Sequence, residues 1–185
     1  MRLSSSLVLL VVAAPWLTAC GDIFGTKDAH QPGDPLGTYH VAAKRGANTC
    51  GEGALGNTAD WEFDVKLARG GTEIFWNNGA EEITGTIDAD ETTFHFDTGV
   101  LMNMRSAESH GLPACSIKRT DRADGKLAAT SVDVASFTGK LEFGFAPTEG
   151  SSCADLVTGS TAVLAKLPCG ILYALEGTRT AAPAP

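Results

Sequence analysis

The sequence predicts an all-β domain in which antiparallel strands form a meander that closes into a small barrel; the alternative is a two-sheet β-sandwich. Apolar and polar residues alternate through most of the chain beyond residue 37, as in strands with one buried face. Short runs rich in Gly, Asn and Asp separate these segments and are typical of tight turns. Only Gly99–Ser109 and Ala154–Lys166 could hold a helical turn.

The chain begins with a segment typical of a secretory signal peptide. Met1 and Arg2 form a short basic start, and an apolar stretch follows from Leu7 to about Ala19. A spanning helix takes about 20 apolar residues, so this stretch is too short to cross a bilayer. Residues 1–19 are therefore predicted to be a cleaved signal peptide.

The four residues Leu17-Thr18-Ala19-Cys20 resemble the lipobox of bacterial lipoproteins. The resemblance implies that Cys20 becomes the lipid-modified N-terminus, and two acyl chains are enough to anchor a protein stably. Gly21 stands where many inner-membrane lipoproteins carry a retention Asp, which implies an outer-membrane location in a Gram-negative cell envelope. The alternative is an ordinary signal peptide followed by a chance cysteine.

The next segment, residues 20–36, is predicted to be a flexible tether. Gly25–Pro35 is polar, holds two prolines and two glycines, and shows no apolar periodicity. The β domain is predicted over residues 37–179, and residues 180–185 are predicted to be a disordered tail. Removing residues 1–19 takes away one positive charge, Arg2, and moves the formal net charge from −8 to −9. This acidic balance argues against nucleic acid as a partner and leaves the lipid as the membrane contact.

The alternation predicts roughly nine strands, mostly joined by short turns. The longest runs are Trp61–Leu67, Phe137–Phe145 and Cys169–Gly177. Shorter runs are Thr38–Lys44, Thr72–Trp76, Ile83–Ile87, Thr92–Phe96, Cys115–Arg119 and Leu127–Val134. Predicted turns are Arg69-Gly70-Gly71, Asn77-Asn78-Gly79, Asp88-Ala89-Asp90 and Ala123-Asp124-Gly125. Closure of such a meander would remove the exposed strand edges.

Four cysteines follow Cys20, and an even number in an exported chain favours disulfide bonds, with three possible pairings. We expect Cys153–Cys169, which would join the two ends of the last hairpin. Cys50–Cys115 then follows largely by elimination. A zinc site is disfavoured because the chain has no C-x-x-C motif or paired histidines.

No catalytic, cofactor or metal site is predicted. The chain lacks a G-x-S-x-G elbow, although a triad assembled only in space would leave no such motif. Gly51–Gly56 matches G-x-G-x-x-G but lacks the preceding apolar strand and following helix that a dinucleotide site requires. His95 alternates with Phe94 and Phe96, which favours a solvated face. We therefore expect that the protein is not an enzyme.

The domain also resembles the calycin or lipocalin plan. The residues that carry this resemblance are Gly37-Thr38-Tyr39 in the first strand and Arg179 after the last. Lipocalins place a Gly-x-Trp in the first strand and cover its Trp with a basic residue, so Tyr39 is a departure. The resemblance implies a small barrel that holds a small apolar ligand.

The expected function is non-catalytic binding of a small apolar ligand or envelope component; the alternative is an interaction protein that docks on another envelope protein. Strand parity puts the candidate ligand residues Trp61, Phe63, Leu141 and Phe143 on the apolar faces. Glycines at 85, 139 and 177 share these faces and are expected to thin the packing, which favours an open cavity, although strand glycines also mark bends.

Overall fold

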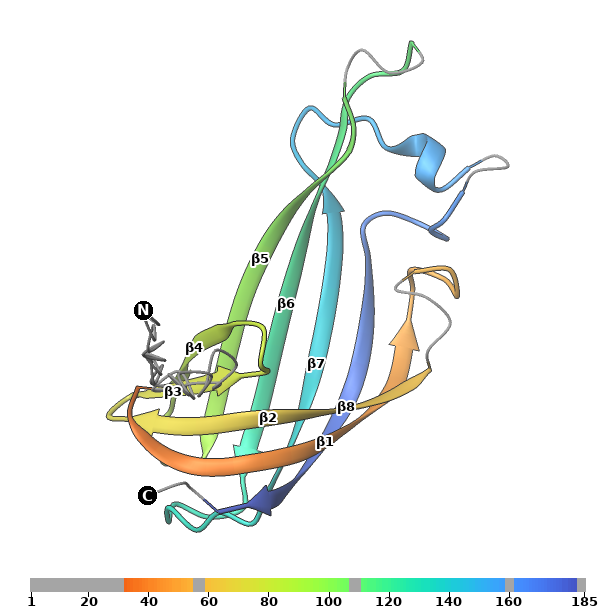
Figure 1. The fold of residues 1–185 in the computed structure, drawn as a ribbon. Helices are drawn as coiled ribbons and strands as arrows, with labels where there is room; N and C mark the ends of the chain where they lie inside the picture. Colours follow the sequence, from red (N-terminus) through yellow and green to blue (C-terminus); the bar gives the residue numbers. More distant parts are fainter. Residues whose placement is uncertain (1–31, 55–58, 107–110, 159–161, 183–185) are drawn as a thin grey trace, which may run out of the picture. The chain divides into compact units, whose positions relative to one another are not determined.

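The computed structural model describes residues 32–54, 59–106, 111–158 and 162–182 and confirms the predicted all-β meander. Eight antiparallel strands pair in chain order, and the last pairs with the first to close a barrel (Figure 1). The strands are β1 (Asp34–Asn48), β2 (Asp60–Gly70), β3 (Glu73–Asn77), β4 (Glu82–Ile87), β5 (Thr93–Arg105), β6 (Cys115–Leu127), β7 (Ser136–Pro147) and β8 (Cys169–Ala181), with a 3-10 helix at Ala154–Leu156. The predicted signal peptide, Cys20 and most of the predicted tether lie outside the described residues.

Three local predictions of strands and turns were wrong. Gly99–Arg105 continues β5 instead of forming a helical turn, because its residues pair with the first half of β6. Ala123-Asp124-Gly125 is not a turn but lies within β6, paired on both sides. Leu127–Val134 is not a strand: β6 ends at Leu127, and the connection to β7 follows. Because Leu127–Val134 belongs to a connection, the structure has eight strands rather than the predicted nine.

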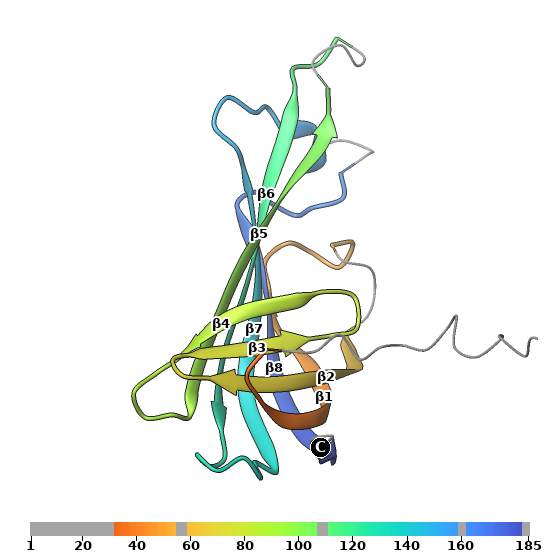
Figure 2. The ribbon, with the colours of Figure 1, turned by 60° about the vertical axis from the view of Figure 1, so that its left-hand side comes forward.

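Strands β5 and β6 extend well beyond the short strands β3 and β4 (Figures 1 and 2). The barrel wall is therefore low on the β3–β4 side and high on the β5–β6 side. Several apolar side chains on or near the projecting part are exposed, and Leu101 has 68% of its surface in solvent. The others are Val100, Met104 and Leu112.

The barrel is closed at the end where β1 begins and β8 finishes. Tyr39 is fully buried there, and its hydroxyl donates to the Val134 carbonyl at 2.8 Å. Burial raises the pKa of the Tyr39 phenol, and the nearby Arg179 charge partly opposes that shift. Leu36 is also fully buried, which explains why β1 begins at Asp34, inside the predicted tether.

Aromatic rings fill the space beside several strand glycines. A Cβ built on Gly177 would lie 2.2 Å from the Phe137 ring, and one on Gly85 would lie 2.4 Å from the Phe96 ring. A Cβ on Gly139 would lie 2.6 Å from the Asp124 carbonyl oxygen of β6. The prediction that these three glycines thin the packing was wrong, because neighbouring rings and backbone occupy the space they leave.

Both predicted disulfide pairings were wrong: the bonds join Cys50 to Cys169 and Cys115 to Cys153. The pairing of Cys153 with Cys169 considered only the hairpin of β7 and β8. Because β8 also pairs with β1, its first residue, Cys169, lies beside the end of β1 and the adjacent Cys50. The Cys50–Cys115 pairing followed by elimination from Cys153–Cys169, so it was wrong for the same reason.

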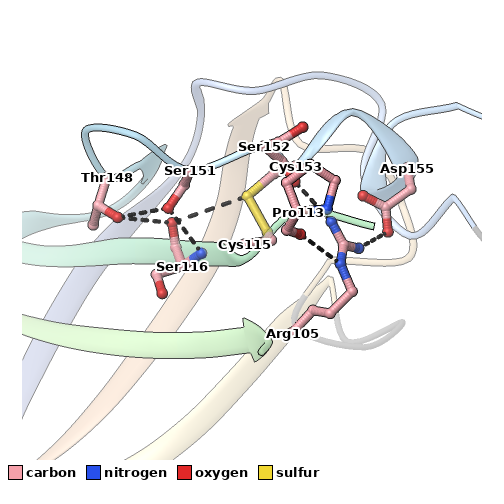
Figure 3. The surroundings of a disulfide bond; sticks show 9 residues. All are labelled: Arg105, Pro113, Cys115, Ser116, Thr148, Ser151, Ser152, Cys153 and Asp155. Atoms are coloured by element: carbon pink, nitrogen blue, oxygen red, sulfur yellow. Dashed lines mark hydrogen bonds and ion pairs between the residues drawn. A yellow bond between two sulfur atoms is a disulfide. The ribbon is translucent and has the colours of Figure 1, made fainter. Parts of the chain in front are cut away.

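The second bond fastens the long loop after β7 to the start of β6 (Figure 3). Arg105, at the end of β5, supports it by donating to the Pro113 carbonyl at 2.9 Å and the Ser152 carbonyl at 2.8 Å. The same guanidinium pairs with Asp155 and, by that hydrogen bond, lowers the pKa of the Asp155 carboxyl. The end of β5, the start of β6 and the loop after β7 therefore meet around this disulfide.

Candidate ligand-binding cavity

A cavity of about 470 Å³ lies inside the barrel, toward the end that carries the β3–β4 turn. Its wall comes from β2 to β8 and includes all four predicted ligand residues. The lining residues are Trp61, Phe63, Trp76, Asn78, Ala80, Glu81, Ile83, Phe96, Thr98, Arg119, Asp121, Ala123, Leu141, Phe143 and Leu175. The volume lies within the range of known small-molecule sites, about 300 to 1,000 Å³.

Strand β2 supplies one aromatic wall of the cavity. Its inward positions become more buried along the strand, from Trp61 at 36% exposure through Phe63 to the buried Val65. The Trp61 and Phe63 rings stack with centroids 4.6 Å apart. Trp61 also meets the edge of Tyr173 from β8 at 6.1 Å. An aromatic wall that is partly exposed at the mouth suits contact with an apolar ligand.

The floor of the cavity is a set of buried rings. Trp76 lies edge-on to Phe96 at 5.6 Å and to Phe137 at 6.0 Å. Phe137 in turn packs against Tyr39 at 5.5 Å, which links the floor to the closed end of the barrel. These rings thus fill the barrel toward the end where β1 begins, and the cavity lies toward the end that carries the β3–β4 turn.

A charged pair stands in the wall formed by β6. Arg119 Nη2 lies 2.7 Å from Asp121 Oδ2, and the guanidinium lies 5.7 Å from the centre of the Phe143 ring on β7. The pair is four strands from β2 in the closed order of eight, so it lies across the barrel from Trp61. The cavity therefore has an aromatic side and a polar side.

Sequence reasoning missed Arg119 and Asp121. It placed a strand at Cys115–Arg119 and a turn at Ala123-Asp124-Gly125, which left Asp121 between elements. Continuing the alternation from Ile117 to Leu127 would have placed both charges on the same face as the buried Ile117 and Ala123. The period-two alternation therefore continues through both residues, but charged residues at inward positions are typical of the end of a strand.

The histidines in described strands lie on the outer surface. His95 Nδ1 is 2.8 Å from Asp124 Oδ1, and this hydrogen bond raises the pKa of His95. His40 pairs with Asp64 at 2.9 Å and has a raised pKa for the same reason. Within the described ranges there is no cluster of three or more His, Cys, Asp or Glu side chains suited to a metal ion.

Comparison with protein-family models, curated proteins and solved structures finds no match to this chain. Among the described residues, no helix is both long and apolar enough to span a bilayer.

Proposed function

We propose that this protein is a lipid-anchored, non-catalytic binding protein of the cell envelope that holds a small apolar ligand inside its barrel. The observation that carries the proposal is the 470 Å³ cavity between the aromatic residues of β2 and the apolar residues of β7. Interior positions of an eight-stranded barrel can either fill the space or leave room for one small ligand. Here side chains fill the barrel near the start of β1, and the space near the β3–β4 turn is open.

The lipocalin resemblance gains support from the closed end of the barrel. Tyr39 on β1 pairs in register with Arg179 on β8, and these are two of the four residues that carry the resemblance in sequence. The aliphatic part of Arg179 also lies against Gly37, where a Cβ would approach it to 2.9 Å. A buried aromatic residue in the first strand beside a basic residue of the last is the lipocalin arrangement, with Tyr in place of Trp.

The proposed binding function predicts saturable binding of N-phenyl-1-naphthylamine, an uncharged fluorescent probe, with about one site per chain. Trp61→Ala is expected to weaken binding about tenfold, because aromatic contacts contribute on the order of 1 kcal/mol beyond their buried area. Probe titration of the exported domain measures both values.

Val132→Ala is the matched control, since Val132 is an exposed apolar residue in the connection between β6 and β7, outside the cavity lining. It should bind the probe like the wild type. A native domain that binds no probe would contradict the proposal. The alternative, docking on another envelope protein, would then be favoured by the exposed apolar residues Val100, Leu101 and Met104 on β5.

The membrane anchor rests on the lipobox resemblance, and we propose that Cys20 carries the lipid and directs the protein to the outer membrane. Cys20→Ser is expected to block lipid attachment and leave an unprocessed precursor, because serine offers no thiol for the thioether. Incorporation of labelled palmitate, followed by gel electrophoresis, measures this. Equal labelling of the wild type and Cys20→Ser would refute the assignment.

A further inference from the structure

We propose that the cavity selects an amphipathic ligand whose polar head group is uncharged and both donates and accepts hydrogen bonds, such as a primary amide on an alkyl chain. The inference rests on the proposed function and specifies the class of ligand. Its basis is the arrangement of Arg119 and Asp121 in the otherwise largely apolar wall of the cavity.

The two charged side chains are paired with each other and only partly exposed. Their Nη2 and Oδ2 atoms are 2.7 Å apart, and 31% of the Arg119 side chain and 19% of the Asp121 side chain remain accessible. Since both residues line the cavity, a ligand inside it would meet this accessible surface. A head group beside the pair would therefore lie next to both a positive and a negative side chain.

The hydrogen bonding of the pair is incomplete within the described residues. Arg119 Nε and Asp121 Oδ1 are buried and have no hydrogen-bond partner there. A buried polar group without a partner is unfavourable, and charged groups suffer most. A head group with a neighbouring donor and acceptor, seated against the pair after a small side-chain adjustment, would supply what each partner lacks.

The pair also disfavours a charged head group. A ligand carboxylate could bind Arg119 only by competing with Asp121, and an ammonium group could bind Asp121 only by competing with Arg119. Breaking a pair in a desolvated site leaves one charge uncompensated, which is costly. Glu81 also lines the cavity, but it is exposed, so solvent screens its charge and it contributes little for or against either ion.

The apolar part of the ligand has a defined place and size. Trp61, Phe63 and Leu141 face the same cavity and would contact an alkyl chain. A volume of 470 Å³ equals that of about 16 water molecules at roughly 30 Å³ each. A ten-carbon chain with a small head group fits within this volume.

The test is displacement of bound N-phenyl-1-naphthylamine by three compounds of equal chain length: decanamide, decanoate and decylamine. Each is used below its aggregation concentration, at neutral pH and low salt. The wild type is expected to bind decanamide at least tenfold more tightly than either charged compound. Asp121→Asn should shift the preference to decanoate, and Arg119→Gln should shift it to decylamine.

The double variant Arg119→Gln/Asp121→Asn is the control: it removes both charges of the pair and should again prefer the amide. A wild type that binds decanoate as tightly as decanamide would overturn the inference, as would an unchanged order in the folded variants. If one variant fails to fold, the wild-type order and the other variants still decide. Absence of probe binding would instead refute the proposed function itself.

Discussion

Gly177→Ala is expected to lower the free energy of unfolding by about 3 kcal/mol, near the upper end of the cost of overpacking a core. The new methyl group would lie 2.2 Å from a ring atom of Phe137, well inside van der Waals contact. Phe137 is 2% exposed and contacts the rings of Tyr39, Trp76 and Phe94, so it has no free space to move into. Urea unfolding followed by tryptophan fluorescence measures the loss.

Gly46→Ala is the matched control, because a Cβ at Gly46 in β1 would meet only the Leu172 carbonyl oxygen at an ordinary 3.5 Å. Its stability should change by less than about 0.5 kcal/mol or rise slightly. Phe137→Leu should partly rescue Gly177→Ala, with a coupling energy of at least about 1 kcal/mol in a double-mutant cycle. Equal stability of Gly46→Ala and Gly177→Ala would contradict this account of the packing.

Removing the Cys50–Cys169 bond is expected to destabilise the domain by about 5 kcal/mol, because the bond closes a loop with a sequence separation of 119 residues. The Cys115–Cys153 bond spans 38 residues and should contribute about 4 kcal/mol on the same chain-entropy model. Urea unfolding of the variants Cys50→Ala/Cys169→Ala and Cys115→Ala/Cys153→Ala tests the order.

Non-reducing peptide mapping of the exported protein provides the independent check of connectivity. It should yield one fragment that joins Cys50 to Cys169 and another that joins Cys115 to Cys153. A fragment joining Cys153 to Cys169 would overturn the observed pairing. Destabilisation in the reverse order would mean that loop length does not dominate the contribution of these bonds.

Much of the barrel could be predicted from period-two alternation because most inward positions are apolar. Trp61, Phe63, Leu141 and Phe143 were found in this way, and all four line the cavity. The prediction failed where an inward position carries a charge, as at Arg119 and Asp121 in β6. The local pattern there resembles a strand end, and only the pairing of β6 with β5 and β7 shows that the strand continues.

The disulfides and the packing at glycines could not be predicted from local sequence for a different reason. Both depend on which strands become neighbours after closure. Cys169 faces Cys50 only because the last strand returns to the first, and the space beside Gly177 is filled by Phe137 from the adjacent strand. The alternation specifies the face on which a residue lies but not the residue it meets there.

The pairing of β1 with β8 has a consequence for how the domain is made. Its register joins Thr38 to Ala181 and Asn48 to Ile171, so the seam brings together the two ends of the domain. Contacts between residues so far apart in sequence form slowly, because loop closure precedes any gain from pairing. A chain still emerging without β8 has two open strand edges, at β1 and β7, that can pair with other chains. Protection of these edges from aggregation therefore comes only once β8 has been synthesised and paired.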